Sequence, residues 1–266
     1  MAVGGGDEIG ASSYYLQIGD TKLLLDFGLR SEGNRLPDYD ELLRNALIEN
    51  MYDIKTIIIS HAHKDHYEGV RYLEEESDKF RIIATPKTRD RILEQINTAK
   101  YEMDKEALKV KSYMHSIIPY EYFKSFYSGN VKITFLPAGH MSGAAMTLME
   151  YKDFRVLYTG DFSFPLTGFS PKECEKKVLQ ILKQCNVLIM ESTHGQRDEV
   201  NLNTKRHADY DELVQFVRLV SPKHLFLVHQ NMQYKAMTLM AQIQEEMPDI
   251  DVVRVENKKV YEVEMK

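Results

Sequence analysis

Short apolar runs alternate with amphipathic segments along most of this chain. In some segments apolar residues occupy every second position or fill several consecutive positions, which is typical of half-buried or fully buried β-strands. In others they recur every three or four positions, as in helices that bury one face. The pattern predicts strands over residues 13–18, 22–27, 55–60, 81–85, 132–136, 145–151, 155–159, 187–191, 225–229, 252–256 and 260–264. It predicts helices over residues 38–49, 69–76, 87–113, 120–127, 172–185, 210–220 and 234–247.

The predicted elements follow one another through short connections. Gly19 and Asp20 join the first two strands, and this dipeptide is a signal for a two-residue hairpin turn. No low-complexity linker or internal repeat divides the chain. With 266 residues and 43% hydrophobic content, the chain can bury a sizeable core as one large domain or two small ones. Two strand-rich sheets covered by helices account for the predicted elements.

The charge balance limits the classes of partner. The formal net charge is −6, whereas broad electrostatic binding to nucleic acid requires clustered Lys and Arg side chains. A nuclease is still compatible with this charge, because bound metal ions can supply the positive field. Residues 1–10 lack the basic and apolar regions of a signal peptide, and no apolar run approaches the length that spans a membrane. We therefore expect a soluble, cytoplasmic protein without a membrane partner.

The segment His61-Ala62-His63-Lys64-Asp65-His66 concentrates side chains that bind metals. It follows the apolar run 56–59 and therefore lies where a buried strand passes into a loop. The alternative is a polar turn that contains three histidines by chance, but the whole chain has only nine histidines. Divalent cations such as zinc bind neutral imidazoles and ionised carboxylates gathered at one point. The spacing lets the first two histidines face one ion while Asp65 and His66 face a second.

Three further candidate ligands each follow a predicted strand. They are His140, Asp161 and His229. A single histidine or aspartate in such a position is more often an ordinary loop residue, but three of them together with the histidine-rich segment indicate one shared site. Asp26 also ends an apolar strand, and we interpret it as a support of the histidine loop rather than as a ligand.

Seven segments resemble those of the metallo-β-lactamase superfamily and, within it, of the β-CASP nucleases, such as ribonuclease J and the pre-mRNA 3′-end processing endonuclease. These segments are 5–10, 61–66, 139–145, 158–162, 191–195, 207–210 and 222–229, so the resemblance covers most of the chain. The histidine-rich segment is shared by the whole superfamily, whereas the last three point to the nuclease branch. The resemblance implies an α/β fold, the αβ/βα four-layer sandwich in which two mixed sheets lie between outer helices. It also implies that residues 1–266 form one domain of this type.

The resemblance assigns roles to the candidate ligands. It implies one zinc ion bound by His61, His63 and His140, a second bound by Asp65, His66 and His229, and Asp161 as a bridge between them. Two ions about 3.5 to 4 Å apart can share a hydroxide, which then attacks a phosphodiester. The ions leave net positive charge at the centre, which favours phosphate esters as substrates. Manganese or iron suits the same ligands and stays an alternative to zinc.

His207 and Glu191 complete the implied mechanism. The leaving oxygen of a phosphodiester needs a proton, and the resemblance makes His207 the general acid and Glu191 the group that orients it. Together with Asp65, these residues form the predicted catalytic set. Taken alone, Glu191 is better explained as a strand-end cap, and His207 as a residue at the start of a helix capped by Asp209.

The chain departs from the β-CASP pattern between these two residues. In relatives an entire inserted domain separates the segments that match 191–195 and His207, but here only residues 196–206 lie between them. The insertion is therefore absent. The chain is a naturally minimal relative, or the domain was removed, or a partner protein or a second copy of the chain covers the site. We expect an open cleft, with weaker binding but room for bulkier or structured nucleic acid.

Three residues are candidates for contacts with substrate phosphates. Lys205 and Arg206 stand where the family usually has small residues; they either replace part of the missing phosphate grip or are solvated loop charges. Ser142 belongs to a run of small residues after His140. It either offers a hydroxyl or backbone N–H to a phosphate, or the run simply lets the next strand pack closely.

Three classes of function follow from these observations. The first is a two-metal phosphodiesterase or nuclease that hydrolyses nucleic acid, in particular RNA, by attack of a metal-bridging hydroxide. The second is a metallohydrolase for a small phosphodiester, cyclic nucleotide or lactone, which the missing insertion and the acidic charge favour. The third is a catalytically silent subunit of a processing complex, although silent relatives usually lose ligands and all seven candidate ligands are present here. The segments around His207 and His229 favour the nuclease.

Overall fold

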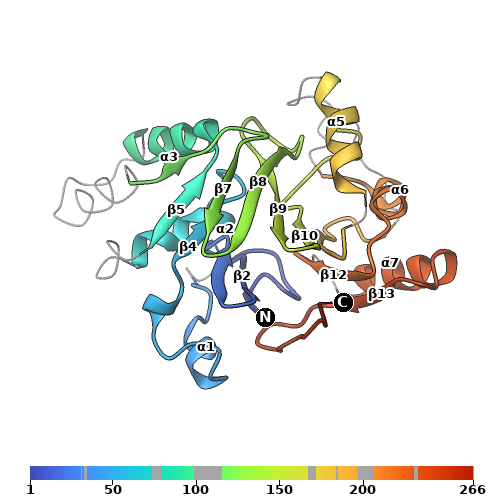
Figure 1. The fold of residues 1–266 in the computed structure, drawn as a ribbon, viewed down its shortest axis with the longest axis horizontal. Helices are drawn as coiled ribbons and strands as arrows, with labels where there is room; N and C mark the ends of the chain where they lie inside the picture. The colour runs from blue at the N-terminus through green and yellow to red at the C-terminus, as the bar shows by residue number, and fades with distance from the viewer. Residues whose placement is uncertain are drawn as a thin grey trace.

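Two mixed β-sheets packed face to face form the centre of the molecule (Figure 1). The computed structural model describes residues 1–30, 32, 35–73, 80–98, 116–166, 172–183, 185–196, 207–230 and 233–265. The first sheet has the strand order β1-β2-β3-β4-β5-β6 and comprises β1 (Ala2–Gly4), β2 (Ser13–Ile18), β3 (Thr21–Leu25), β4 (Thr56–Ile58), β5 (Arg81–Ala84) and β6 (Ile118–Pro119). The second has the order β13-β12-β11-β10-β9-β8-β7 and comprises β7 (Ser125–Ser128), β8 (Val131–Pro137), β9 (Ala145–Tyr151), β10 (Phe154–Tyr158), β11 (Val187–Glu191), β12 (His224–Val228) and β13 (Asp251–Arg254).

Helices cover the outer sides of both sheets. They are α1 (Asp40–Arg44), α2 (Lys64–Tyr67), α3 (Pro86–Thr98), α5 (Lys172–Leu182), α6 (Tyr210–Val220) and α7 (Gln233–Glu246), with 3-10 turns η2 (Met51–Asp53) and η3 (Glu68–Tyr72). In Figure 1, α3 lies beside the first sheet, and α5, α6 and α7 lie along the outer side of the second. This arrangement confirms the expected sandwich of two mixed sheets between helices. Among the helices in the described ranges, none has the length and apolarity needed to cross a membrane.

Both faces of the sheets are buried, and side-chain alternation along the strands shows how. In β3, Leu23 and Leu25 belong to the apolar cluster between the two sheets. Leu24 belongs to a second cluster that includes Ile92 of α3. Successive residues of a strand point to opposite faces. Because neither face of residues 23–25 meets water, this part of β3 is an unbroken apolar run in the sequence.

Parallel strands determine where polar residues gather. Strands β3 to β6 are parallel in the first sheet, and β10 to β13 are parallel in the second. Their carboxyl ends meet at one edge of the sandwich. There the hydroxyl of Tyr158, at the end of β10, donates to Asp26 Oδ2 at 2.7 Å, just after β3. This edge, called the polar edge below, holds the loops that follow β3, β4, β8, β10 and β12.

The predicted elements are largely confirmed. The bounds of β2, β9, β11 and α6 agree with the prediction. The helix expected over 38–49 is confined to α1, and the one expected over 69–76 is the 3-10 turn η3 as far as the structure describes it. The helix expected over 87–113 is α3 up to residue 98, and the rest of that range lies outside the described residues.

Two predicted elements are wrong. The range 120–127 is a loop followed by β7, whose pairing with β8 overrides an aromatic spacing that resembles a helix. The range 260–264 forms no strand, although Tyr261 and Val263 pack against the apolar cluster between the sheets and the glutamates beside them are exposed. Alternating burial thus arises here without backbone pairing to either described sheet, and an apolar-polar pattern cannot distinguish the two cases.

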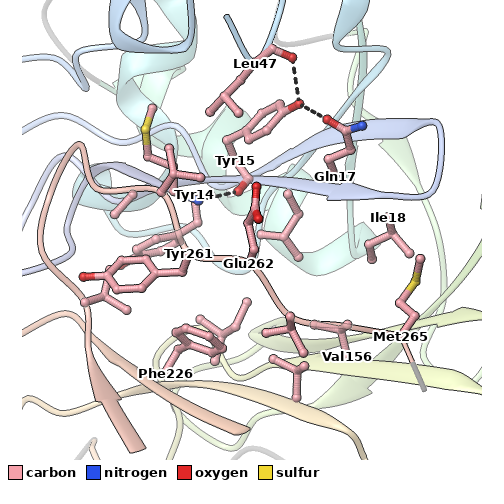
Figure 2. Close-up of a pocket in the computed structure, with 18 of the residues that line it drawn as sticks. Tyr14, Tyr15, Gln17, Ile18, Leu47, Val156, Phe226, Tyr261, Glu262 and Met265 are labelled. Carbon is pink, nitrogen blue, oxygen red and sulfur yellow. Dashed lines mark hydrogen bonds between the residues drawn. The ribbon is translucent and has the colours of Figure 1, made fainter. Parts of the chain in front are cut away.

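The core between the sheets is incompletely filled between β2 and the strands β10 to β12. A pocket of about 730 Å³ opens there near the beginnings of β10 and β11. Figure 2 shows Ile18 on one side of this pocket and Val156 and Phe226 on the other, with Tyr261 and Met265 of the C-terminal segment between the sheets. The apolar side chains that line the pocket therefore have space beside them that other core residues lack.

A larger side chain is expected to be accepted in this pocket but not in the filled core. Val156→Ile adds one methylene next to the pocket and should raise the free energy of unfolding by up to about 1 kcal/mol. The matched change Val217→Ile, at a fully buried position in α6, should lower it by about 1–3 kcal/mol because the core there is already packed. Urea unfolding followed by circular dichroism measures both, since the chain has no tryptophan. Equal destabilisation by the two substitutions would contradict the prediction.

Candidate metal centre

All seven predicted ligands meet at the polar edge. Their ligand atoms form two groups, and within each group the atoms lie no more than 4.8 Å apart. The first group comprises His61, His63, His140 and Asp161, and the second comprises Asp65, His66 and His229. Each comes from a loop that leaves the carboxyl end of a strand: β4 for the histidine-rich segment, then β8, β10 and β12. Residues separated by up to 168 positions in the sequence (61 to 229) thus share one centre because their strands end at one edge.

The backbone of the histidine-rich segment explains how it serves both groups. His63 is extended, with φ −88° and ψ 143°, and it caps the short helix α2 that begins at Lys64. In an extended backbone residues two apart point to the same side, so His61 and His63 face one group. The helical turn then redirects Asp65 and His66 toward the other group.

The first group contains three imidazole nitrogens that lie close together. His63 Nδ1 lies 3.0 Å from His61 Nε2 and 3.2 Å from His140 Nε2. Asp161 Oδ2 lies 3.5 Å from His61 Nε2 and 3.8 Å from His140 Nε2. These four atoms therefore converge on a common point.

The second group faces the other oxygen of the same aspartate. Asp65 Oδ2 lies 3.7 Å from His66 Nε2 and 3.4 Å from His229 Nε2. Asp161 Oδ1 lies 3.5 Å from His66 Nε2 and 3.6 Å from His229 Nδ1. Asp161 stands between the two groups with one oxygen toward each, as expected of a shared ligand.

A glycine permits this position of Asp161. Gly160 has φ +54°, a backbone conformation that glycine adopts without strain. A Cβ atom at this position would lie 2.7 Å from Ser60 Cβ. The missing side chain lets the loop after β10 approach the loop after β4, so Asp161 reaches the histidines.

The donor set fits divalent cations. Ligands about 2.1 Å from a tetrahedral zinc ion are about 3.4 Å apart, and the donor separations above range from 3.0 to 3.8 Å. Within the described part of the chain, two buried donor atoms at the centre, His66 Nε2 and Asp161 Oδ1, have no hydrogen-bond partner. Buried polar atoms are normally satisfied, so atoms that converge without hydrogen bonds are suited to bind a cation.

The electrostatics keep His61, His63 and Asp65 in the protonation state that binds metals, whereas, against the effect of burial, the neighbouring carboxylate of Asp161 raises the pKa of His66 and of His229. Burial and the neighbouring His66 hold the pKa of His61 well below its usual value, and burial lowers the pKa of His63 to about 4. Both rings therefore keep a lone pair at neutral pH. Burial opposes ionisation of Asp65, but His66 and His229 lower its pKa to about 2, so this carboxylate is charged.

Asp26 supports the centre from behind. His66 Nδ1 lies 2.7 Å from Asp26 Oδ2, and Ser60 donates to the same carboxylate through its N–H at 2.7 Å and its hydroxyl at 2.8 Å. A hydrogen bond from Nδ1 fixes the tautomer and leaves Nε2 of His66 as the ligand atom. Asp26 contacts His66 but belongs to neither donor group, which fits its interpretation as a support.

Asp26→Asn is expected to weaken binding of a divalent ion by about 10- to 100-fold, because the amide orients His66 less firmly than the carboxylate does. Titration with zinc in competition with a chromophoric chelator measures the affinity. Tyr158→Phe is the matched control, since it removes one donor to Asp26 but keeps the bond to His66. Similar losses in both variants would indicate a general packing effect.

Glu191 and His207 form a buried pair beside the centre. His207 Nδ1 lies 2.9 Å from Oε1 and 2.8 Å from Oε2 of Glu191, and His207 Nε2 lies 3.9 Å from Asp161 Oδ2. Glu191 also accepts the N–H of Phe162 at 2.8 Å and the hydroxyl of Thr193 at 2.5 Å. Glu191 is near enough to Asp161 to be a ligand, but these bonds use both of its oxygens. This geometry fits the predicted role of Glu191 in orienting His207.

His194 is a residue of the site that the sequence pattern did not single out. Its ring lies edge-on to that of His207, with 5.9 Å between the ring centroids. The residue belongs to the turn after β11, next to the predicted Glu191. The position of His194 three residues after Glu191 is the feature of the sequence that could have pointed to it.

Of the three predicted substrate contacts, Ser142 lies within the described residues. Lys205 and Arg206 are outside the described residues, so their predicted role is untested. Ser142 is half-buried in the loop between β8 and β9, two residues after His140. Its predicted contact with a phosphate stays a prediction.

The sequence matches a known family over most of its length. Residues 35–230 match the family described as Beta-lactamase superfamily domain. The chain is 24% identical over 220 residues to "RNase aCSPSF2" of Saccharolobus solfataricus, and the aligned region covers 81% of this chain and 42% of that protein. It is 25% identical over 200 residues to "Ribonuclease J" of Mycoplasma pneumoniae, which covers 74% of this chain and 33% of that protein. The chain thus spans between a third and about two fifths of the length of these relatives.

A solved structure confirms the fold independently. The metallo-beta-lactamase fold protein YhfI from Bacillus subtilis superposes with a TM-score of 0.64, at 17% identity, over 94% of this chain and 91% of that one. The superfamily and the nuclease branch inferred from the motifs are therefore confirmed as what this chain resembles.

Proposed function

Because this chain belongs to the beta-lactamase superfamily, we propose that it is a two-metal nuclease that hydrolyses phosphodiester bonds in RNA. The observation that carries the proposal is the convergence of seven metal-competent side chains beside the Glu191–His207 pair. The named ribonucleases among its relatives support RNA as the substrate. Their much greater length leaves the substrate and partners of this chain a proposal.

The proposed metal ligands are those of the two groups described above. One ion would be bound by His61, His63 and His140, the other by Asp65, His66 and His229, with Asp161 shared. When bound, such ions activate water and neutralise charge on the phosphate. Imidazole and carboxylate donors suit zinc, and manganese or iron is the alternative.

In the proposed reaction, His207 supplies the proton that the leaving ribose oxygen needs. Glu191 accepts the N–H at Nδ1 and so directs Nε2 toward the centre. Burial favours the neutral ring, but Glu191 raises the pKa of His207 to about 9, so the ring is protonated at neutral pH. As the bond between phosphorus and the leaving oxygen breaks, the proton moves from Nε2 to that oxygen and the ring becomes neutral.

We further propose that the substrate reaches an open site. Only residues 196–206 connect the turn after β11 with His207, which supports the proposal that residues 1–266 form one domain without an inserted one. Lys205, Arg206 and Ser142 are proposed to contact substrate phosphates. A partner protein or a second copy of the chain is proposed to cover the cleft when single strands are bound tightly.

Cleavage of end-labelled single-stranded RNA and DNA by the zinc-loaded protein tests the proposed function. Cleavage of RNA that is sensitive to salt and abolished by a chelator would support a nuclease. Turnover of bis-p-nitrophenyl phosphate without cleavage of either oligonucleotide would overturn it in favour of a small-molecule hydrolase. Failure to turn over any of these substrates with both ions bound would point to the silent-subunit alternative.

A further inference from the structure

The turn that follows β11 is fixed by contacts on both sides. Ser192 donates through its N–H and its hydroxyl to the carbonyl of Val228, each at 2.9 Å. Gly195 lies so close to α7 that a Cβ atom there would be 2.6 Å from the carbonyl oxygen of Lys235. The turn is therefore attached to β12 and to α7, and its side chains have defined directions.

His194 is the accessible side chain of this turn. Ser192 is fully buried and Thr193 is 8% exposed. Thr193 also faces inward, with its hydroxyl 2.5 Å from Glu191 Oε2 and 3.0 Å from His229 Nδ1. His194 is partly exposed, and its ring meets the ring of His207 edge-on. A substrate group bound at His207 would therefore lie close to His194 as well.

We propose that His194 binds a phosphate oxygen of the substrate next to the bond that His207 helps to cleave. This inference rests on the proposed nuclease function. An imidazole carries at least one N–H donor in every protonation state, and phosphate oxygens are acceptors. The neighbouring carboxylates Glu191 and Asp161 are buried and, when ionised, offer no hydrogen-bond donor, so the donor of His194 gives a phosphate oxygen a partner that they cannot provide.

The chemistry of the contact separates this proposal from base stacking. Histidine can also place its ring against a nucleobase. A hydrogen bond to phosphate depends on the N–H, whereas stacking depends on the flat ring. Glutamine keeps a donor without the ring, and phenylalanine keeps the ring without a donor. These two substitutions therefore test the two contacts independently.

The experiment compares His194→Ala, His194→Gln and His194→Phe in the zinc-loaded full chain. We expect His194→Ala to raise KM for RNA by roughly 10- to 100-fold, as for a lost hydrogen bond to a charged group, with a much smaller change in kcat. His194→Gln should restore most of the affinity, and His194→Phe should behave as His194→Ala. His224→Ala, at the opposite end of β12, serves as control, and the zinc content and circular dichroism of each variant are measured.

Binding of a phosphorothioate RNA that resists hydrolysis, followed by fluorescence anisotropy, gives a readout that does not depend on cleavage. An unchanged affinity of His194→Ala would overturn the phosphate contact, and so would recovery by His194→Phe but not by His194→Gln. If the unsubstituted protein binds the analogue but cleaves no RNA, the proposed nuclease function fails, while the anisotropy series still decides the role of His194.

Discussion

Asp161→Asn is expected to reduce kcat/KM for RNA by roughly 10³-fold or more, because the shared carboxylate contributes to both halves of the centre. Its two oxygens lie 3.5 Å from His61 Nε2 and 3.5 Å from His66 Nε2. Asparagine has nearly the same shape but carries no charge and offers only one acceptor oxygen. One of the two groups of ligands therefore loses the carboxylate oxygen that faces it. Zinc stoichiometry, measured by atomic emission on the dialysed protein, should fall in parallel with activity.

The matched control is Asp153→Asn in the exposed turn between β9 and β10. It makes the same chemical change on the same protein and should leave both zinc content and activity unchanged. Full activity of Asp161→Asn with the normal zinc content would refute the shared-ligand assignment. Loss of activity with both ions retained would assign Asp161 to the reaction but not to metal binding.

The sequence predicts the site well where side chains that bind metals directly follow a predicted strand. Parallel strands end at one edge of a sheet, so histidines and aspartates that each follow an apolar run must lie near one another once the strands are recognised. This reasoning placed Asp161 and His229 beside the histidine-rich segment. In the structure, His229 Nδ1 lies 3.6 Å from Asp161 Oδ1. The support by Asp26 follows from the same rule, because Asp26 is the first residue after β3.

The sequence predicts poorly where the outcome depends on contacts between distant segments. The aromatic spacing in 120–127 resembles a helix, but pairing of β7 with β8 places Phe126 between the sheets. His194 meets the ring of His207 because the turn after β11 and the segment before α6 converge at the polar edge. Such contacts are properties of the folded chain, and no local pattern encodes them.

His207→Ala should slow RNA cleavage by about 10²- to 10⁴-fold in kcat, the usual contribution of general acid catalysis. The leaving oxygen of ribose is a poor leaving group and needs the proton that His207 holds. Bis-p-nitrophenyl phosphate has a leaving group that departs as a stable anion, so the same variant should lose much less activity on it. A substrate-dependent loss of this kind distinguishes proton donation from a role in folding or metal binding.

Glu191→Gln should show the same dependence on the leaving group as His207→Ala, because Glu191 acts through His207 in the proposed reaction. Neutral glutamine removes the largest contribution that raises the pKa of His207, and only the charge of Asp161 still opposes the effect of burial, so less of the ring is protonated at neutral pH. Equal losses on RNA and on bis-p-nitrophenyl phosphate would overturn the role of His207 as general acid. Equal losses with reduced zinc content would instead place the pair in the metal centre, since Glu191 lies within reach of Asp161 and His229.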